Sequence, residues 1–234
     1  SVQSTFEKEK QFNQNVSHEL RTPLSVIVSE SEFGSKYADN LEETKESLTV
    51  IHRQAKLMKS MTEQILEISK TQHLQWSDLK PVCLSTLVSD YCQGQERKWG
   101  ESPIAFEVSI QPDLWIQGDA VLVTRMLDNL LSNAVKFTKT KVAIHLVASP
   151  AGAVLKVADD GIGIAPDHLS KIWDRFYQVE DSRNKGLNSG IGLGLSFIKD
   201  IADLHRAEVK IISEEGKGSL FRVTFPQIQD KTSV

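Results

Sequence analysis

Val16-Ser17-His18-Glu19-Leu20-Arg21-Thr22-Pro23-Leu24 is the stretch from which the fold of the N-terminal region is predicted. Its apolar residues recur every four positions, at Val16, Leu20 and Leu24, which is the spacing of one face of an α-helix. The same spacing occurs in a second polar stretch after residues 34–40, whose Gly, Asp and Asn are typical of a turn. The sequence therefore predicts a helical hairpin from about Ser1 to Gln72.

Each arm of this hairpin has a single apolar stripe. The stripes consist of Phe6, Val16, Leu20, Leu24 and Ile27 in the first arm, and of Leu48, Ile51, Ala55, Met58, Ile65 and Ile68 in the second. Two helices with one stripe each bury little of it alone, whereas two hairpins can pair into a four-helix bundle. We therefore expect a homodimer.

After a short connector, Trp76 to Pro81, short apolar runs alternate with longer helical stretches, which predicts a mixed α/β domain. The predicted strands are 104–110, 142–148, 154–158, 208–213 and 219–225, and the predicted helices are 85–99, 120–137 and 193–204. Asp119 directly precedes the second of these helices and is a suitable N-cap. Residues 166–189 fit neither period and contain Arg175, Arg183 and Lys185, so we expect a mobile, basic loop there.

Composition excludes several classes of function. Lysine and arginine number 27 against 31 acidic residues, a net charge of −4, so we expect no nucleic-acid partner and no direct membrane contact. No apolar run approaches the roughly 20 residues that a membrane helix needs. Cys83 and Cys92 lack metal-ligand spacing and are typical of a reducing compartment, so we expect a cytoplasmic chain. The helical pattern is already under way at Ser1, which suggests a longer parent protein.

His18 has a distinctive setting within the first helix. Thr22 is four residues away and shares its face, whereas Glu19 points about 100° around the helix and must reach sideways to touch the imidazole. Pro23 lacks an N–H for the carbonyl of Glu19, so we expect a bend beside the histidine. For Thr22 the alternative is a hydroxyl bonded back to its own helix.

The predicted helix 120–137 carries Asn129, Asn133 and Lys136 on one face. An amide oxygen is a ligand that Mg²⁺ accepts, usually beside phosphates and waters, and Asn is a poor helix former. This face can therefore meet a charged ligand with its metal ion. Solvated amides on an exposed face are the alternative.

Two glycine-containing segments follow. In Asp159-Asp160-Gly161-Ile162-Gly163, after a predicted strand, a carboxylate can accept a hydrogen bond from an adenine amino group, while the glycines allow close approach and positive φ. Gly190-Ile191-Gly192-Leu193-Gly194-Leu195 opens a helix, where free N–H groups suit phosphate oxygens. Its spacing is not that of a dinucleotide fingerprint, and the sequence contains no Walker A motif.

Taken in order, these segments resemble the H-box, N-box, G1 box and G2 box of sensor histidine kinases. Ile172-Trp173-Asp174-Arg175-Phe176-Tyr177 resembles the F-box, and Gly216-Lys217-Gly218-Ser219-Leu220-Phe221 resembles the last glycine motif. The resemblance covers nearly the whole chain. The departures are Asp160 and Trp173, where Asn and Phe are usual, and Ile191 and Ser219, where threonine is frequent.

The resemblance implies a function in two-component signalling. His18 would accept the γ-phosphoryl group of ATP, Glu19 would accept its imidazole proton, and the phosphoryl group would pass to an aspartate of a response regulator receiver domain. Thr22 would orient a water for phosphatase activity. Asn133 would be the leading magnesium ligand, joined by Asn129. The remaining nucleotide contacts would come from Lys136, Asp159, Gly161, Gly163, Arg175, Gly190, Gly192, Leu193, Gly194 and Leu195.

The same resemblance implies the fold and the domains. Residues 1–75 would form a dimerisation and histidine phosphotransfer domain, a dimeric four-helix bundle. Residues 76–81 would be the linker, 82–228 a Bergerat-type α/β sandwich that binds ATP, and 229–234 a C-terminal tail. Residues 166–189 would form the ATP lid. The parent protein would be attached to the bacterial inner membrane.

Two rival functions remain open at this point. An ATPase of the gyrase, mismatch-repair or chaperone type shares the Asn and Asp-Gly motifs, although the H-box argues against it. The other rival is a non-catalytic dimeric scaffold that binds ATP without transferring phosphate, against which the intact Asn133, Asp159 and His18 argue. Labelling with ATP distinguishes all three.

Overall fold

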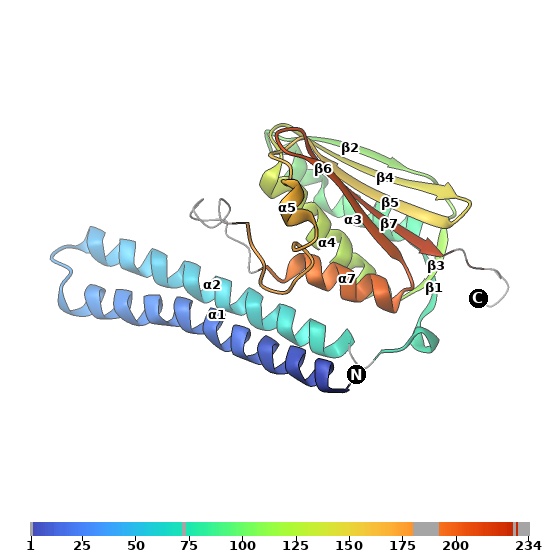
Figure 1. Ribbon diagram of the computed structural model, residues 1–234. Coiled ribbons are helices and arrows are strands. Elements are labelled where there is room, and N and C mark those ends of the chain that lie inside the picture. Colours follow the sequence, from blue (N-terminus) through green and yellow to red (C-terminus); the bar gives the residue numbers. More distant parts are fainter. Residues whose placement is uncertain (1, 72–73, 180–191, 227, 229–234) are drawn as a thin grey trace. The chain divides into compact units, whose positions relative to one another are not determined.

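The computed structural model of the protein describes residues 2–71, 74–179, 192–226 and 228, with only the backbone described for 2–9, 11–13 and 70. The chain divides into two compact units, Ser1–Lys70 and Thr71–Val234 (Figure 1). The bounds that the sequence suggests for the linker, 76–81, stay a prediction. Within the described ranges, no helix combines the length and the apolarity that crossing a bilayer demands.

The first unit is a helical hairpin, as predicted. α1 (Val2–Lys36) and α2 (Leu41–Thr71) are joined by residues 37–40. Asn40 accepts a hydrogen bond from the backbone N–H of Glu43 at 3.0 Å, and the Glu43 carboxylate accepts one from the N–H of Asp39 at 2.9 Å. These reciprocal bonds satisfy free donors at the start of α2 and fix where the chain turns.

The turn is shorter than predicted, because Gly34 to Lys36 remain helical. A Cβ on Gly34 would lie 3.4 Å from Cβ of Ser47, which is buried on α2. The glycine therefore serves the close approach of the two helices instead of the turn. α1 also continues without interruption through Pro23, so a bend beside His18 stays a prediction.

The second unit is built on a five-stranded sheet with the order β2-β4-β5-β7-β6. Its strands are β2 (Ala105–Ile110), β4 (Lys141–Ser149), β5 (Gly152–Asp159), β6 (Glu208–Glu214) and β7 (Gly218–Pro226). β2 is parallel to β4, and the other neighbours are antiparallel. A separate two-stranded sheet pairs β1 (Lys80–Cys83) with β3 (Trp115–Gly118).

Three helices, α3 (Leu84–Gly100), α4 (Ala120–Phe137) and α7 (Gly194–Leu204), lie against one face of the larger sheet (Figure 1). Strand residues on that face form the core: Val142, Ile144 and Leu146 are fully buried. The residues between them, such as His145, point to the other side of β4 and are partly exposed. We call this second side the outer face.

The predicted strands and helices of this unit are confirmed, with ends shifted by a few residues. Asp119 caps α4 as expected, accepting hydrogen bonds from the N–H groups of Val121 and Leu122. The strands β1 and β3, the one-turn helix α5 (Pro166–Leu169) and the 3-10 turn η1 (Trp76–Asp78) were not predicted. Elements of three or four residues are too short for a periodic pattern to identify them in the sequence.

Candidate phosphoacceptor and nucleotide-binding sites

His18 lies on α1 with 76% of its side chain exposed, and its Nδ1 is 3.9 Å from a carboxylate oxygen of Glu19. This distance is beyond hydrogen-bonding range, as expected for neighbours on a helix. A side-chain rotation is enough to bring the carboxylate onto Nδ1. The imidazole is thus accessible from solvent and has one potential proton acceptor beside it.

The Thr22 hydroxyl faces back along its own helix, donating to the carbonyl oxygen of His18 at 3.4 Å. This is the alternative that the sequence left open for Thr22. The bond is long and exposed, so its net contribution is small. A rotation about χ1 would free the hydroxyl on the face that it shares with the imidazole.

The amide face of α4 is presented as predicted. Leu122, Met126, Leu130 and Ala134 are buried, whereas Asn129, Asn133 and Lys136 are partly exposed on another side of the helix. Asn129 donates from its side-chain nitrogen to the carbonyl of Arg125 at 3.0 Å, which leaves its amide oxygen for other contacts. This oxygen lies close to Gly194, where a Cβ would be 3.1 Å away.

Lys136 lies at the end of α4, with its ammonium 4.7 Å from the centre of the Phe137 ring. Burial lowers the pKa of Lys136, because desolvation disfavours the charged ammonium. A phosphate group near this ammonium would offset that cost.

Asp159 ends β5 and is half-buried. Its Oδ1 accepts a hydrogen bond from the N–H of Gly161 at 2.9 Å. Burial is the main cause of a raised pKa for Asp159, while hydrogen bonds from the backbone of Gly161 and Ser219 act in the opposite direction. A half-buried carboxylate held by two N–H groups is well suited to accept another hydrogen bond.

Gly161 and Gly163 are both required, but for different reasons. Gly163 has the predicted positive φ, 69°, which favours glycine. The φ of Gly161 is not positive, so the prediction of a positive φ is wrong for this residue. It is needed because a Cβ there would overlap the carbonyl oxygen of Phe137 at the end of α4. This close contact holds the loop after Asp159 against α4.

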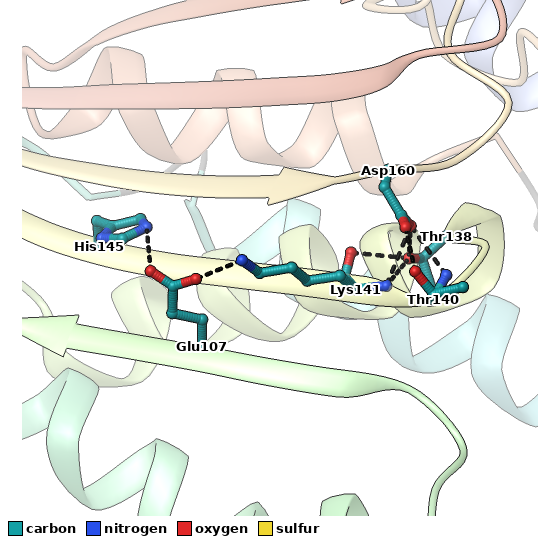
Figure 2. Close-up of polar contacts among 6 residues, drawn as sticks. All are labelled: Glu107, Thr138, Thr140, Lys141, His145 and Asp160. Atoms are coloured by element: carbon teal, nitrogen blue, oxygen red, sulfur yellow. Dashed lines mark hydrogen bonds and ion pairs between the residues drawn. The ribbon is translucent and has the colours of Figure 1, made fainter.

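Asp160 holds the connection between α4 and β4 (Figure 2). Its carboxylate accepts hydrogen bonds from the hydroxyls of Thr138 and Thr140, and from the N–H groups of Lys139, Thr140 and Lys141. The pKa of Asp160 lies well below its usual range, and the hydrogen bond from the Thr138 hydroxyl is the largest cause. The sequence did not identify this role, although two threonines within residues 138–140 were the available signal.

The segment after α5 is fastened to the start of α7. The N–H of Phe176 donates to the carbonyl of Gly192 at 2.8 Å, and Arg175 forms an ion pair with Asp200 of α7 at 2.8 Å. Burial is the largest cause of a raised pKa for Asp200, and the Arg175 guanidinium opposes it. Arg175 therefore has a protein carboxylate as partner in this conformation.

The glycine-rich segment is only partly described. Residues 180–191, which include Gly190 and the second part of the predicted lid, lie outside the described residues. Leu193 has a buried side chain, so that any contact to a ligand would come from its backbone, while Gly194 and Leu195 are partly exposed in the first turn of α7. The side chain of Leu193, the N-cap residue, has no polar group that could cap α7. The N–H groups at the start of α7 therefore suit an anion.

The structure thus brings Asn129 of α4 to Gly194 of α7, and Asp159 of β5 to Gly161 and Ser219. It does not place these groups in the cavity of about 470 Å³ between α3 and β2, which is lined by residues such as Trp99 and Phe106. Among the described residues, no group of three or more His, Cys, Asp or Glu side chains could hold a metal ion. A Mg²⁺ ion here would depend on amide oxygens and phosphates, a donor set that the α4 face fits.

Two family models match the chain in the same order as its two units. Residues 8–74 match the His Kinase A (phospho-acceptor) domain. Residues 118–229 match the family described as histidine kinase-, DNA gyrase B-, and HSP90-like ATPase. The first match contains His18, and the second contains all the predicted nucleotide contacts.

Similar proteins include the sensor histidine kinase YkoH of Bacillus subtilis, 32% identical over 95% of this chain and 48% of that protein. Another is the phosphate regulon sensor protein PhoR of Pseudomonas aeruginosa, 33% identical over 94% of this chain and 50% of that protein. The chain therefore spans about half the length of these relatives.

Solved structures share the fold. Histidine kinase ThkA, in complex with response regulator protein TrrA, aligns with a TM-score of 0.77 at 22% identity, over 98% of this chain and 65% of that one. Acinetobacter baumannii histidine kinase AdeS aligns with a TM-score of 0.67 at 18% identity, over 90% of this chain and 98% of that one. Both domains are matched in order, and the relatives YkoH and PhoR align along nearly the whole chain. The chain therefore belongs to the two-component sensor histidine kinases and comprises the catalytic core of such a protein.

Proposed function

We propose that this chain transfers the γ-phosphoryl group of ATP to His18 and then to an aspartate of a response regulator receiver domain. The observation that carries the proposal is the exposed imidazole of His18 beside Glu19, in a chain whose second unit matches the histidine kinase-, DNA gyrase B-, and HSP90-like ATPase family. His18 and the ATP site belong to different units. Transfer therefore requires the two to come together.

The chemistry at His18 follows from its surroundings. Glu19 is near Nδ1 and can accept the proton of that nitrogen, so the lone pair of Nε2 is the nucleophile. Nε2 attacks the γ-phosphorus, the bond to the bridging oxygen breaks, and ADP leaves with its electron pair. Phosphohistidine then donates the phosphoryl group to the receiver aspartate.

The second unit would position the nucleotide. Asp159 would accept a hydrogen bond from the adenine amino group, with Gly161 and Gly163 shaping the loop beneath the base. The first N–H groups of α7, near Gly194, would bind phosphate oxygens. Asn133, with Asn129, would hold Mg²⁺, which when bound neutralises charge on the phosphates.

We propose in addition that Thr22 supports phosphatase activity toward the phosphorylated regulator. Its hydroxyl is one helical turn from His18, where the regulator's phosphoryl group would be placed. The hydrogen bond from Thr22 to its own helix is long enough, 3.4 Å, to be exchanged for a water. The freed hydroxyl could then orient that water for attack.

A homodimer is supported by the apolar surface of the hairpin. Leu24, Leu48 and Leu66 are 49%, 58% and 61% exposed in a single chain. Packing against a second hairpin would bury such side chains. Attachment of the parent protein to the bacterial inner membrane remains a prediction.

Incubation with ATP labelled at the γ-phosphate tests the proposal. Acid-labile, base-stable label should appear in the wild-type chain and be absent from His18→Gln. His52→Gln is the matched control, because His52 is an exposed histidine on α2, and it should label normally. ATP hydrolysis with no protein label would favour the gyrase type of ATPase, and ATP binding without either reaction would favour a scaffold.

A further inference from the structure

The outer face of the sheet carries a row of basic side chains that the nucleotide site does not use. The strand register places His145 of β4 opposite Lys156 of β5, Lys156 opposite Arg222 of β7, and Arg222 opposite Lys210 of β6. Because neighbouring strands are about 4.8 Å apart, these four residues form a line of roughly 14 Å across the strands. We call it the basic row.

The ends of the basic row have acidic partners. Glu107 lies 3.9 Å from His145 and also pairs with Lys141 (Figure 2), and Glu208 lies 2.7 Å from Lys210. At each end, therefore, the chain itself supplies a negative charge.

The centre of the basic row has no such acidic partner among the described residues. Within the described parts of the chain, Lys156 and Arg222 form no ion pair, although they are directly opposite each other. Like charges in opposite positions are unfavourable in a sheet. Nε of Arg222 is also buried with no hydrogen-bond partner among the described residues, which is itself costly. An acidic group from another molecule would offset the repulsion between the two positive charges.

A second row runs beside the first and is apolar. Ala143 is opposite Ala158, Ala158 is opposite Leu220, and Leu220 is opposite Ile212. Ile212 is 62% exposed. Each member is two residues along its strand from a member of the basic row, a separation of about 6.6 Å. The outer face thus presents the positive charges of Lys156 and Arg222 next to a line of apolar side chains.

This pattern matches an amphipathic helix. On a helix, residues at i, i+4 and i+7 are about 5–6 Å apart and form one row, close to the spacing of strands in a sheet. A helix lying across the strands could therefore align acidic residues with the basic row and apolar residues with Ala158 and Leu220. The chain has a net charge of −4, so the basic row is a local feature.

We propose that the outer face is a docking surface for a partner protein, through an amphipathic helix with a row of Asp or Glu beside a row of apolar residues. Charge complementarity at Lys156 and Arg222 would orient the helix, and the apolar row would supply the buried area. The proposal goes beyond phosphoryl transfer, because none of these residues belongs to the ATP site or to α1.

The test uses the full chain and a labelled synthetic helical peptide of about 15 residues, long enough to cover the row. Its Glu residues stand at i, i+4, i+7 and i+11, with Leu on the adjacent face. A peptide of the same composition in scrambled order is the control. Fluorescence anisotropy should show binding of the patterned peptide that weakens with salt.

Lys156→Glu/Arg222→Glu should weaken this binding by at least about tenfold, the equivalent of 1.4 kcal/mol, and Ile212→Asp should weaken it too. Lys199→Glu is the matched control, since Lys199 is an exposed lysine on α7, and it should bind as the wild type does. Circular dichroism and ATP affinity confirm the fold, and the milder Lys156→Gln replaces the double variant if that one unfolds.

Three results would overturn the proposal. One is equal affinity for the patterned and scrambled peptides. Another is unchanged affinity in the Lys156 and Arg222 variants. The third is binding of heparin or of anionic phosphatidylserine vesicles through the basic row without binding of the peptide, which would indicate a polyanion or membrane site. Because autophosphorylation can be measured in the same variants, failure here is distinguishable from failure of the proposed kinase activity.

Discussion

The side-chain oxygen of Asn129 lies so close to Gly194 that a Cβ on the glycine would be only 3.1 Å from it. This contact joins the amide face of α4 to the first turn of α7, two elements separated by more than 50 residues. It places a candidate metal ligand beside N–H groups that suit phosphate. The nucleotide site therefore depends on the fit between these two helices.

Gly194→Ala should weaken ATP binding several-fold, because the added methyl displaces the Asn129 amide. Alanine otherwise favours a helix over glycine by about 0.5–1 kcal/mol, so stability should change little or rise. Isothermal titration with ATP and thermal unfolding measure the two effects. Gly94→Ala on α3 is the control, because nothing lies within 4 Å of its added Cβ. Equal ATP affinity in the two variants would contradict the role of the contact.

Asn133→Ala should abolish autophosphorylation while the fold, followed by circular dichroism, is kept. The reason is loss of the leading Mg²⁺ ligand. ATP affinity should therefore depend on Mg²⁺ in the wild type and much less in the variant, which titrations with and without EDTA compare. Undiminished labelling of Asn133→Ala would refute the metal role.

Asp160→Asn should destabilise the second unit by about 1 kcal/mol at neutral pH, allowing for solvent around this carboxylate. The pKa of Asp160 is lowered in the folded state, chiefly by the Thr138 hydroxyl. Its contribution is thus fully present above the unfolded pKa, about 3.9, and is lost as the pH falls through the folded value.

Denaturant unfolding from pH 7 down to pH 3 checks this, and the difference between wild type and Asp160→Asn should shrink below about pH 4. Asp90→Asn, at an exposed position on α3, serves as control and should follow the wild-type curve. A constant difference across the whole range would show that the carboxylate charge is not the cause.

The sequence was sufficient to predict most of the helices and strands of the second unit. The apolar run in residues 142–148 indicated β4, and α4 has both its apolar spacing and its cap at Asp119, so local pattern and final structure agree. The hairpin was predicted for the same reason. Its turn was placed too early because Gly34, a common turn residue, serves helix packing against Ser47 instead.

What could not be predicted depends on pairing between distant segments. β1 and β3 have four residues each and are strands only because they pair with each other. The role of Asp160 needs the end of α4 to lie beside the end of β5. The basic row exists only in the register that aligns Lys156 with Arg222, and no single-strand pattern contains that register.

Thr22→Ala should leave autophosphorylation of His18 intact but slow dephosphorylation of the regulator by about tenfold or more, since a misplaced reacting group can cost about 10²-fold in rate. Thr22→Ser retains the hydroxyl and should restore most of the rate. The assay follows loss of phosphate from the phosphorylated receiver domain. Identical phosphatase rates in wild type and Thr22→Ala would leave the threonine with a structural role only.

The most direct test of the account is to locate the phosphoryl group after incubation of the wild-type chain with ATP and Mg²⁺. Mass spectrometry under neutral conditions identifies the modified residue, and ³¹P NMR of the intact protein identifies the bond. The account predicts a phosphoramidate at Nε2 of His18 and none at His52. A phosphoryl group on another residue, or none in a chain that binds ATP, would contradict it.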